Sequence, residues 1–204
     1  MNKSATVYVV DDDPSYLVAV GRLLRAAGFE ARMFASSAEF LTQVSRDTRG
    51  CVVSDLQMPG LNGLELQEAL ARSGTPLPVV FLTGRGDIPS TVRAMRQGAV
   101  DFLEKLAPDH QLIAAVRRAL ERDAAERAAR ARHDELRRRF AALTMREREV
   151  LRHVVRGQMN KQIAADLGIH ERTVKLHRTA ITRKVGVPSV AELTTLAREA
   201  GLFE

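Results

Sequence analysis

Apolar residues along the first 120 positions fall into two alternating patterns. Some form short continuous runs rich in valine and phenylalanine, which are typical of strands. Others recur every three or four positions, which is typical of amphipathic helices. The strand-like runs are residues 6–10, 30–34, 51–54, 78–82 and 101–104. Strands and helices that alternate in this way form βαβ units, so we predict an α/β domain with a five-stranded, doubly wound parallel sheet.

The pattern changes at residues 109–140, where alanine, arginine and glutamate dominate and large apolar residues are few. Such a segment forms a helix readily but has little to bury. We therefore predict that the last helix of the first domain continues into a solvated linker. Leu120, Leu136 and Phe140 are spaced loosely like the seam of a coiled coil, which stays open as an alternative.

Residues 141–204 show no strand pattern, and glycine-containing turns divide them into four short helical segments. The first segment begins with Thr144 and Glu147, which have the spacing of a capping box. We therefore predict three parts: an α/β domain at residues 1–120, a helical linker at 121–140 and an all-α bundle at 141–204.

The net positive charge of the chain arises entirely in its second part. Residues 1–120 contain 13 Lys and Arg against 13 Asp and Glu, whereas residues 121–204 contain 18 against 12. This asymmetry indicates an anionic partner, either nucleic acid or an anionic membrane. Cys51 is the only cysteine, which excludes an intrachain disulfide. No apolar run approaches the roughly 18 residues of a spanning helix, so we predict a soluble cytoplasmic protein that does not enter a membrane.

Polar residues with complementary chemistry follow the predicted strands. Asp11 and Asp12 come after the first strand, and Asp55 ends the third. Thr83 follows the fourth strand and Lys105 follows the fifth. Ligands of an open parallel sheet bind beyond the carboxyl ends of its strands, so these side chains are expected to converge. Clustered carboxylates suit Mg²⁺, one carboxylate can attack phosphorus, and the hydroxyl and ammonium groups can bind phosphate oxygens.

The first aspartates also allow a different interpretation. Asp11 and Asp13 have the spacing of a haloacid-dehalogenase-type phosphatase, in which they would be the nucleophile and the acid/base. That interpretation leaves Asp55 and residues 141–204 without a purpose. Asp13 directly precedes Pro14, which suits the first position of a helix, so we predict that Asp13 caps the helix that follows.

Four motifs within residues 5–120 resemble those of two-component response regulator receiver domains, which have a flavodoxin-like fold. They are "VVDDDPS", "SDLQMPGLNGLEL", "VVFLTGRGD" and "AVDFLEK". The resemblance implies that a sensor histidine kinase phosphorylates Asp55. It further implies that Mg²⁺ is held by Asp11, Asp12, Asp55 and the carbonyl of Gln57. Thr83 and Phe102 would form the switch pair. Lys105 would bind the phosphate.

One residue departs from the receiver pattern. Receivers usually have proline after the lysine, often in a cis peptide, whereas Leu106 follows Lys105 here. A non-proline cis bond costs about 2.5–4 kcal/mol, so we predict a trans bond with a displaced loop and a displaced Lys105. A degenerate receiver that acts without phosphorylation therefore stays open as an alternative.

The basic segment at residues 171–185 is predicted to form an amphipathic helix. Val174, Ile181 and Val185 share one face. The opposite face is largely basic and contains Arg172, Lys175, Leu176, Thr179 and Arg183. A short helical segment and a glycine turn precede it, as in a helix-turn-helix, whose second helix enters the major groove of DNA.

The stretch from Leu143 to Leu193 resembles the LuxR-type helix-turn-helix in "LTMREREVL", "GQMNKQIAADLGI" and "TVKLH". The resemblance implies two groups of DNA contacts. Base edges would be met by Lys175, Leu176 and Thr179, and phosphates by Lys161, Thr173, His177 and Arg178. His170 stands where a hydroxyl cap is usual, and hydroxyl caps are worth about 1 kcal/mol, so we expect the recognition helix to fray at its start.

Receiver and helix-turn-helix together resemble the FixJ/NarL class of transcriptional regulators, and the long helical linker is closer to FixJ. The resemblance implies a regulator that is not an enzyme. Its phosphorylated receiver would form a homodimer through residues 88–105 and bind double-stranded promoter DNA, where it would meet RNA polymerase. The final predicted helix, at residues 189–200, is expected to add a second dimer contact.

Overall fold

A computed structural model describes residues 5–75, 77–84 and 88–202. The chain divides into two compact units between Glu126 and Arg127. The division into receiver, linker and DNA-binding domain at residues 120 and 140 stays a prediction.

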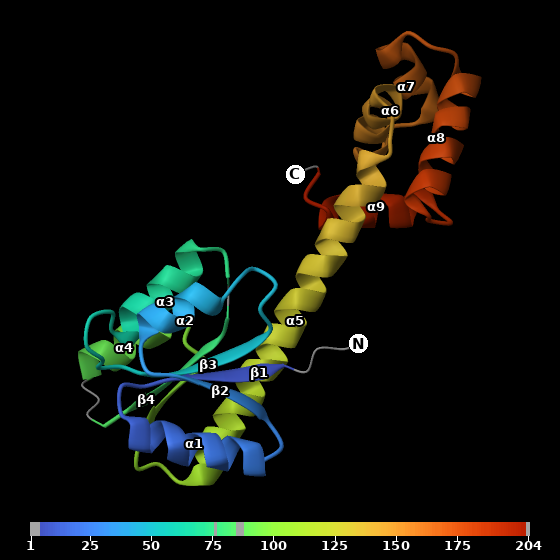
Figure 1. The fold of residues 1–204 in the computed structure, drawn as a ribbon. Coiled ribbons are helices and arrows are strands. Elements are labelled where there is room, and N and C mark those ends of the chain that lie inside the picture. Colours follow the sequence, from blue (N-terminus) through green and yellow to red (C-terminus); the bar gives the residue numbers. More distant parts are fainter. Residues whose placement is uncertain (1–4, 76, 85–87, 203–204) are drawn as a thin grey trace. The chain divides into compact units, whose positions relative to one another are not determined.

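The first unit contains a five-stranded parallel sheet, as the alternating pattern predicted (Figure 1). Its strands are β1 Thr6–Val10, β2 Glu30–Phe34, β3 Gly50–Asp55, β4 Val79–Thr83 and β5 Asp101–Glu104. They are ordered β2-β1-β3-β4-β5, so the chain reverses its direction of winding at β1. Parallel pairing brings the carboxyl ends of β1, β3, β4 and β5 to one edge of the sheet.

Helices cover both faces of this sheet (Figure 1). They are α1 Pro14–Ala26, α2 Ser37–Gln43, α3 Gly63–Arg72, α4 Ile88–Arg96 and the first part of α5 Asp109–Ala141. One apolar core lies between the sheet and α2, α3 and α4, and a second lies between the sheet and α1 and α5. Strands β1, β3 and β4 are buried at every position, which is why they read as nearly continuous apolar runs, whereas the edge strands β2 and β5 are partly exposed.

The second unit contains the last part of α5 and four further helices. These are α6 Met145–Val155, α7 Asn160–Leu167, α8 Glu171–Val185 and α9 Val190–Glu199. Leu136 and Phe140 are buried in the core of this unit, at 4% and 3% exposed. The prediction of a solvated linker is therefore wrong for the end of α5, where two large side chains at i and i+4 face the bundle.

Helix α9 packs its apolar residues into the second unit. Leu193 is fully buried in the core of its own unit, and Val190 and Leu196 pack against the same core. The apolar face of α9 is therefore used within its own unit, and the second dimer contact expected of this helix stays a prediction.

Glu147 links two helices of the second unit. Thr144 and Glu147 form the predicted capping box at the start of α6. The Glu147 carboxylate, 5% exposed, also accepts a hydrogen bond of 2.7 Å from Nζ of Lys184 in α8. Burial acts to raise the pKa of Glu147, but the hydrogen bonds from Lys184 and Thr144 outweigh it and hold the pKa below its ordinary value.

We expect this link to make the second unit sensitive to acid. Because the pKa of Glu147 is lower in the folded state, its stabilisation is present above the ordinary value of 4.5 and is lost as the pH falls through the lowered pKa. Glu147→Gln should lower the free energy of unfolding by about 1–3 kcal/mol at pH 7. It should also flatten the acid limb of the plot of stability against pH, which is the loss of stability as the pH falls below about 4.5. Circular dichroism melts of the full chain between pH 3 and 7 measure this.

Glu192 provides the matched control for that experiment. It follows the cap of α9 by three residues, as Glu147 does in α6, but its exposed carboxylate makes no hydrogen bond within the described part of the chain. Glu192→Gln should leave the acid limb unchanged. An equal flattening in both variants would contradict the assignment to Glu147.

None of the helices described in either unit is both long and apolar enough to cross a membrane.

Candidate functional site

Three carboxylates meet at the carboxyl edge of the sheet in the first unit. Asp11 and Asp12 follow β1, and Asp55 ends β3. Each offers an oxygen within 4.8 Å of the others. Lys105, directly after β5, reaches the same place, while Thr83 ends β4 beside them. The convergence that the strand ends predicted is therefore present for the three carboxylates and Lys105.

The two oxygens of Asp55 have different partners. Oδ1 accepts hydrogen bonds from the backbone N–H of Leu56 at 2.6 Å and of Gln57 at 3.3 Å. Oδ2 lies 2.9 Å from Nζ of Lys105. The residue is only 7% exposed, because β3 is buried on both faces up to its last position. One oxygen is thus fixed by the backbone and the other depends on a side chain that can move.

Asp11 is buried more completely, at 1% exposed. Its Oδ1 accepts a hydrogen bond of 2.9 Å from the N–H of Asp13, and its Oδ2 lies 2.6 Å from Nζ of Lys105. Burial raises the pKa of Asp11 above its ordinary value, although both contacts oppose the rise. Asp12 is exposed and therefore presents its carboxylate at the mouth of the pocket.

Lys105 occupies the pocket despite the leucine that follows it. The described residues contain no cis peptide bond, so the predicted trans bond before Leu106 is confirmed. The prediction that Lys105 would be displaced is wrong, because its Nζ lies between Asp11 and Asp55. Burial acts to lower the pKa of Lys105, but its hydrogen bonds to Asp11 and then Asp55 raise the pKa overall.

Thr83 and Phe102, the predicted switch pair, lie on neighbouring strands. Thr83 is 1% exposed, and Phe102 is half-buried with its ring centroid 6.0 Å from that of Phe81. The side chain of Gln57 is exposed, as expected of a residue whose proposed ligand is its backbone carbonyl.

The donor set fits Mg²⁺. Octahedral oxygens about 2.1 Å from Mg²⁺ lie roughly 3–4 Å from one another, which is close to the spacing of the three carboxylates. Two buried carboxylates and an exposed one repel each other unless a cation lies among them, and Lys105 already neutralises Asp11 and Asp55 in part. Carboxylate oxygens beside an open mouth are ligands that Mg²⁺ accepts while retaining some of its waters.

The carboxylate of Asp13 is separate from the carboxylate cluster and caps α1, as predicted. Its Oδ1 accepts hydrogen bonds from the N–H of Ser15 at 2.8 Å and of Tyr16 at 3.3 Å, with Pro14 at the first helical position. A carboxylate engaged in this way is poorly placed to be the acid/base of a phosphatase.

Asp13→Ala should therefore affect stability and leave metal binding nearly unchanged. We expect a loss of about 1 kcal/mol in the free energy of unfolding and a Mg²⁺ affinity close to that of the wild type. Urea denaturation and calorimetric Mg²⁺ titration measure the two quantities. Asp12→Ala is the control that should lose Mg²⁺ affinity, and a matching loss in Asp13→Ala would place Asp13 among the ligands.

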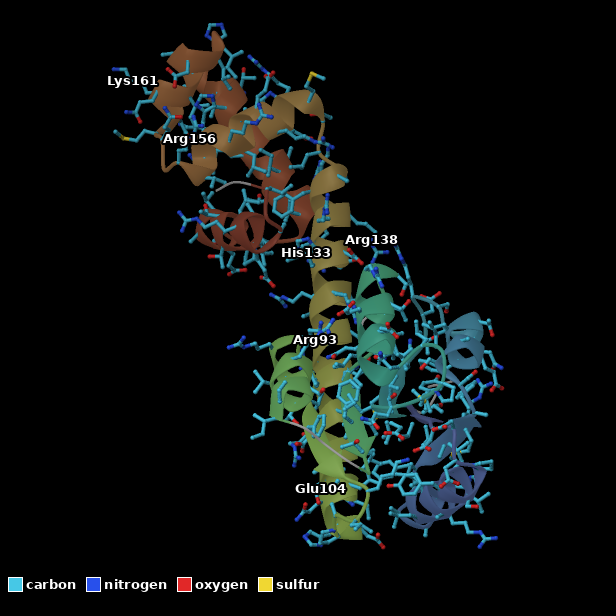
Figure 2. The ribbon with its side chains drawn as sticks, turned by 90° about the vertical axis from the view of Figure 1, so that its left-hand side faces the viewer. Arg93, Glu104, His133, Arg138, Arg156 and Lys161 are labelled. Atoms are coloured by element: carbon cyan, nitrogen blue, oxygen red, sulfur yellow. The ribbon has the colours of Figure 1, made fainter. Side chains whose placement is uncertain are left out.

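The second unit places its basic residues around α8. Val174, Ile181 and Val185 are buried, as their spacing predicted. Among the predicted DNA contacts, the exposed residues are Lys161, Lys175, Leu176 and Thr179, and the half-buried ones are Thr173, His177 and Arg178. Figure 2 shows Lys161, from α7, on the outer surface of this unit together with Arg156. His170 precedes α8, and its side chain accepts no capping hydrogen bond from the backbone of the helix.

Two partners of the site residues had no signal in the sequence. Nη1 of Arg178 donates to Oδ1 of Asn160 at 2.5 Å and so ties α8 to the start of α7. The ring of Tyr16 lies beneath Nζ of Lys105, 4.5 Å from it. Both contacts join residues from separate elements. An asparagine or a tyrosine at these positions does not by itself predict such a contact.

Comparison with known proteins agrees with both units. The description "Response regulator receiver domain" matches residues 7–117, and "Bacterial regulatory proteins, luxR family" matches residues 141–197. The response regulator protein TodT of Pseudomonas putida is 39% identical over 192 residues, which cover 94% of this chain and 85% of TodT.

Two further relatives match over almost their whole length. The transcriptional regulatory protein FixJ of Azorhizobium caulinodans is 41% identical over 202 residues, covering 99% of this chain and 96% of FixJ. The solved structure of the response regulator StyR is similar with a TM-score of 0.87 and 45% identity, covering 96% of this chain and 99% of StyR. The chain therefore belongs to the response regulators that join a receiver domain to a LuxR-type DNA-binding domain, and it is homologous to the transcriptional regulators of the FixJ class.

Proposed function

We propose that Asp55 accepts a phosphoryl group from a sensor histidine kinase and that this modification increases the affinity of the chain for promoter DNA. The observation that carries the proposal is the placement of Asp55. Its buried carboxylate has one oxygen fixed by two backbone N–H groups and the other facing Lys105, within 4.8 Å of two further carboxylates.

The transfer itself is a displacement at phosphorus. Oδ2 of Asp55 attacks the phosphorus of a phosphohistidine, an O–P bond forms, and the P–N bond breaks with its electron pair on the imidazole nitrogen. Lys105 moves from Oδ2 to the oxygens of the phosphoryl group and neutralises their charge. Mg²⁺, held by Asp11, Asp12, Asp55 and the carbonyl of Gln57, would supply further neutralising charge when bound.

Phosphorylation then changes the conformation of the predicted switch pair, Thr83 and Phe102. The hydroxyl of Thr83 turns to the phosphoryl oxygens, and Phe102 repacks in the space that this opens. The surface at residues 88–105 next to them forms the homodimer. Its helix α4 exposes Ile88, Val92 and Met95 at i, i+4 and i+7, an apolar stripe suited to a second copy.

The dimer would present two copies of α8 to successive major grooves. Lys175, Leu176 and Thr179 are exposed on one face of α8 and would meet base edges. Phosphates would be met by Lys161, Thr173, His177 and Arg178, of which Arg178 is already oriented by Asn160. A regulator bound at a promoter in this way would also contact RNA polymerase.

The two alternatives are less well supported. A degenerate receiver is expected to lack part of the pocket, whereas the three clustered carboxylates and the contacts of Lys105 with Asp11 and Asp55 support a receiver that can be phosphorylated. A haloacid-dehalogenase-type phosphatase needs Asp13 free, and Asp13 is engaged as a helix cap.

DNA affinity with and without a phosphoryl mimic tests the function. Affinity for a target promoter, at one stated salt concentration, should rise at least tenfold when Mg²⁺ and beryllofluoride are added together. Mg²⁺ alone is the control. Equal affinity in both conditions would favour a regulator that acts without phosphorylation.

A further inference from the structure

Tyr16, in the first turn of α1, contacts the lysine of the acidic pocket. Nζ of Lys105 lies 4.5 Å from the centroid of the Tyr16 ring, a distance at which the ring face attracts a cation. The ring is half-buried and packs against the core beneath α1. Its position is therefore fixed by packing, and it can act as a rigid support for the flexible lysine side chain.

The segment after Lys105 gives that side chain little other support. The backbone of Lys105 is held at the sheet edge, where its N–H donates to the carbonyl of Thr83 at 2.8 Å. Leu106, however, is 94% exposed, and Pro108 is exposed as well. The direction of the ammonium group thus depends on its two carboxylate partners and on the ring of Tyr16.

A neighbouring cavity offers the lysine a competing position. It has a volume of about 250 Å³ and is lined by Lys105, Tyr16, Leu23, Glu104 and Asp109 among others. Glu104, labelled in Figure 2, and Asp109 are exposed carboxylates that can pair with an ammonium group. Without the ring of Tyr16, the side chain of Lys105 would have both the room and the charge to turn towards this cavity.

We propose that Tyr16 is a positioning residue, which holds Lys105 in the acidic pocket through its ring face and so speeds phosphorylation of Asp55. The role rests on the proposed function of Asp55. Leu106, directly after the lysine, does not constrain the Lys105 side chain in this chain. Tyr16, from α1, provides that constraint instead.

Phosphorylation of the full-length protein by radiolabelled acetyl phosphate with Mg²⁺ tests the proposal. Tyr16→Leu removes the ring and should slow labelling about three- to tenfold, the size expected for a cation–π contact of ordinary strength. Tyr16→Phe keeps the ring face and should retain at least half of the wild-type rate. Mg²⁺ affinity, measured by calorimetry, should not fall in either variant, since Tyr16 is not a ligand.

A double-mutant cycle separates positioning from a structural role. In a Lys105→Met background, Tyr16→Leu should slow labelling no further, because its partner is already absent. Leu23→Ala is the matched control, since Leu23 lines the same cavity and packs on the same core but has no aromatic ring to offer the ammonium group. It should change stability and leave the labelling rate unchanged.

Three results would overturn the role of Tyr16: an unchanged rate in Tyr16→Leu, an equal loss in the Lys105→Met background, or an equal loss in Leu23→Ala. Failure of the proposed function is distinguishable, because label would then map to a residue other than Asp55 in the wild-type protein.

Discussion

Asp55→Asn is expected to reduce phosphoryl transfer to the background level, at least a hundredfold below the wild type. The amide has nearly the shape of the carboxylate, and its oxygen can still accept the hydrogen bond from the N–H of Leu56. It is neutral, however, and a far weaker nucleophile, so no O–P bond forms. Radiolabel from a phosphorylated kinase or acetyl phosphate measures the loss. The response of DNA affinity to beryllofluoride should disappear with it.

Asp13→Asn is the matched control for this experiment. It makes the same change of charge three residues after β1, at a side chain that caps α1 and lies outside the carboxylate cluster. Labelling should stay within about twofold of the wild type, because asparagine is as good a cap as aspartate. Label that persisted in Asp55→Asn and mapped to Asp11 would instead support the phosphatase interpretation.

Gly50→Ala is expected to destabilise the first unit severely. Gly50 begins β3 with φ +130°, which an L side chain rarely adopts, and an added Cβ would lie 1.8 Å from the carbonyl oxygen of Thr6. Thr6 is its partner in the β1–β3 pairing, so relief of the clash must separate the two central strands. The N–H of Gly50 also donates to the buried Asp123 at 2.9 Å, a bond that would be lost. We expect a cost above about 4 kcal/mol, measured by urea denaturation.

Gly60→Ala separates the effect of backbone angle from that of space. Gly60 also has positive φ, at +78°, but an added Cβ would meet nothing within 4 Å. This substitution should cost only about 1–2 kcal/mol. If Gly50→Ala cost no more than that, the close approach of β1 and β3 would be wrong.

The strands were predictable because a buried parallel sheet imposes a pattern on every position. The observed strands differ by at most one residue at either end from the predicted runs. Helix α2 had no individual prediction, since its seven residues are too few to show a clear period. Its cap is visible only in retrospect, where Ser36 accepts a hydrogen bond from the N–H of Glu39.

The acidic pocket was predictable for a different reason. Parallel strands all end at one edge, so residues 40 or more positions apart, such as Asp11 and Asp55, must meet once the sheet forms. The position of Lys105 did not follow from this rule. The local sequence pointed to displacement, because proline is absent after it, and the contacts with Asp11, Asp55 and Tyr16 hold it in the pocket instead.

The sequence by itself determined the α/β order of the first unit, the helical nature of the second, the capping role of Asp13 and the group of residues at the strand ends. The first three follow from periodicity and local hydrogen bonding, which act over a few residues, and the fourth follows from the rule that parallel strands end at one edge of a sheet. Only the tertiary structure decided that Lys105 stays in the pocket over Tyr16, that the backbone of Thr6 lies where a Cβ of residue 50 would be and that Leu136 and Leu193 are buried in one core. Each of these depends on contacts between distant elements, which a local pattern does not encode.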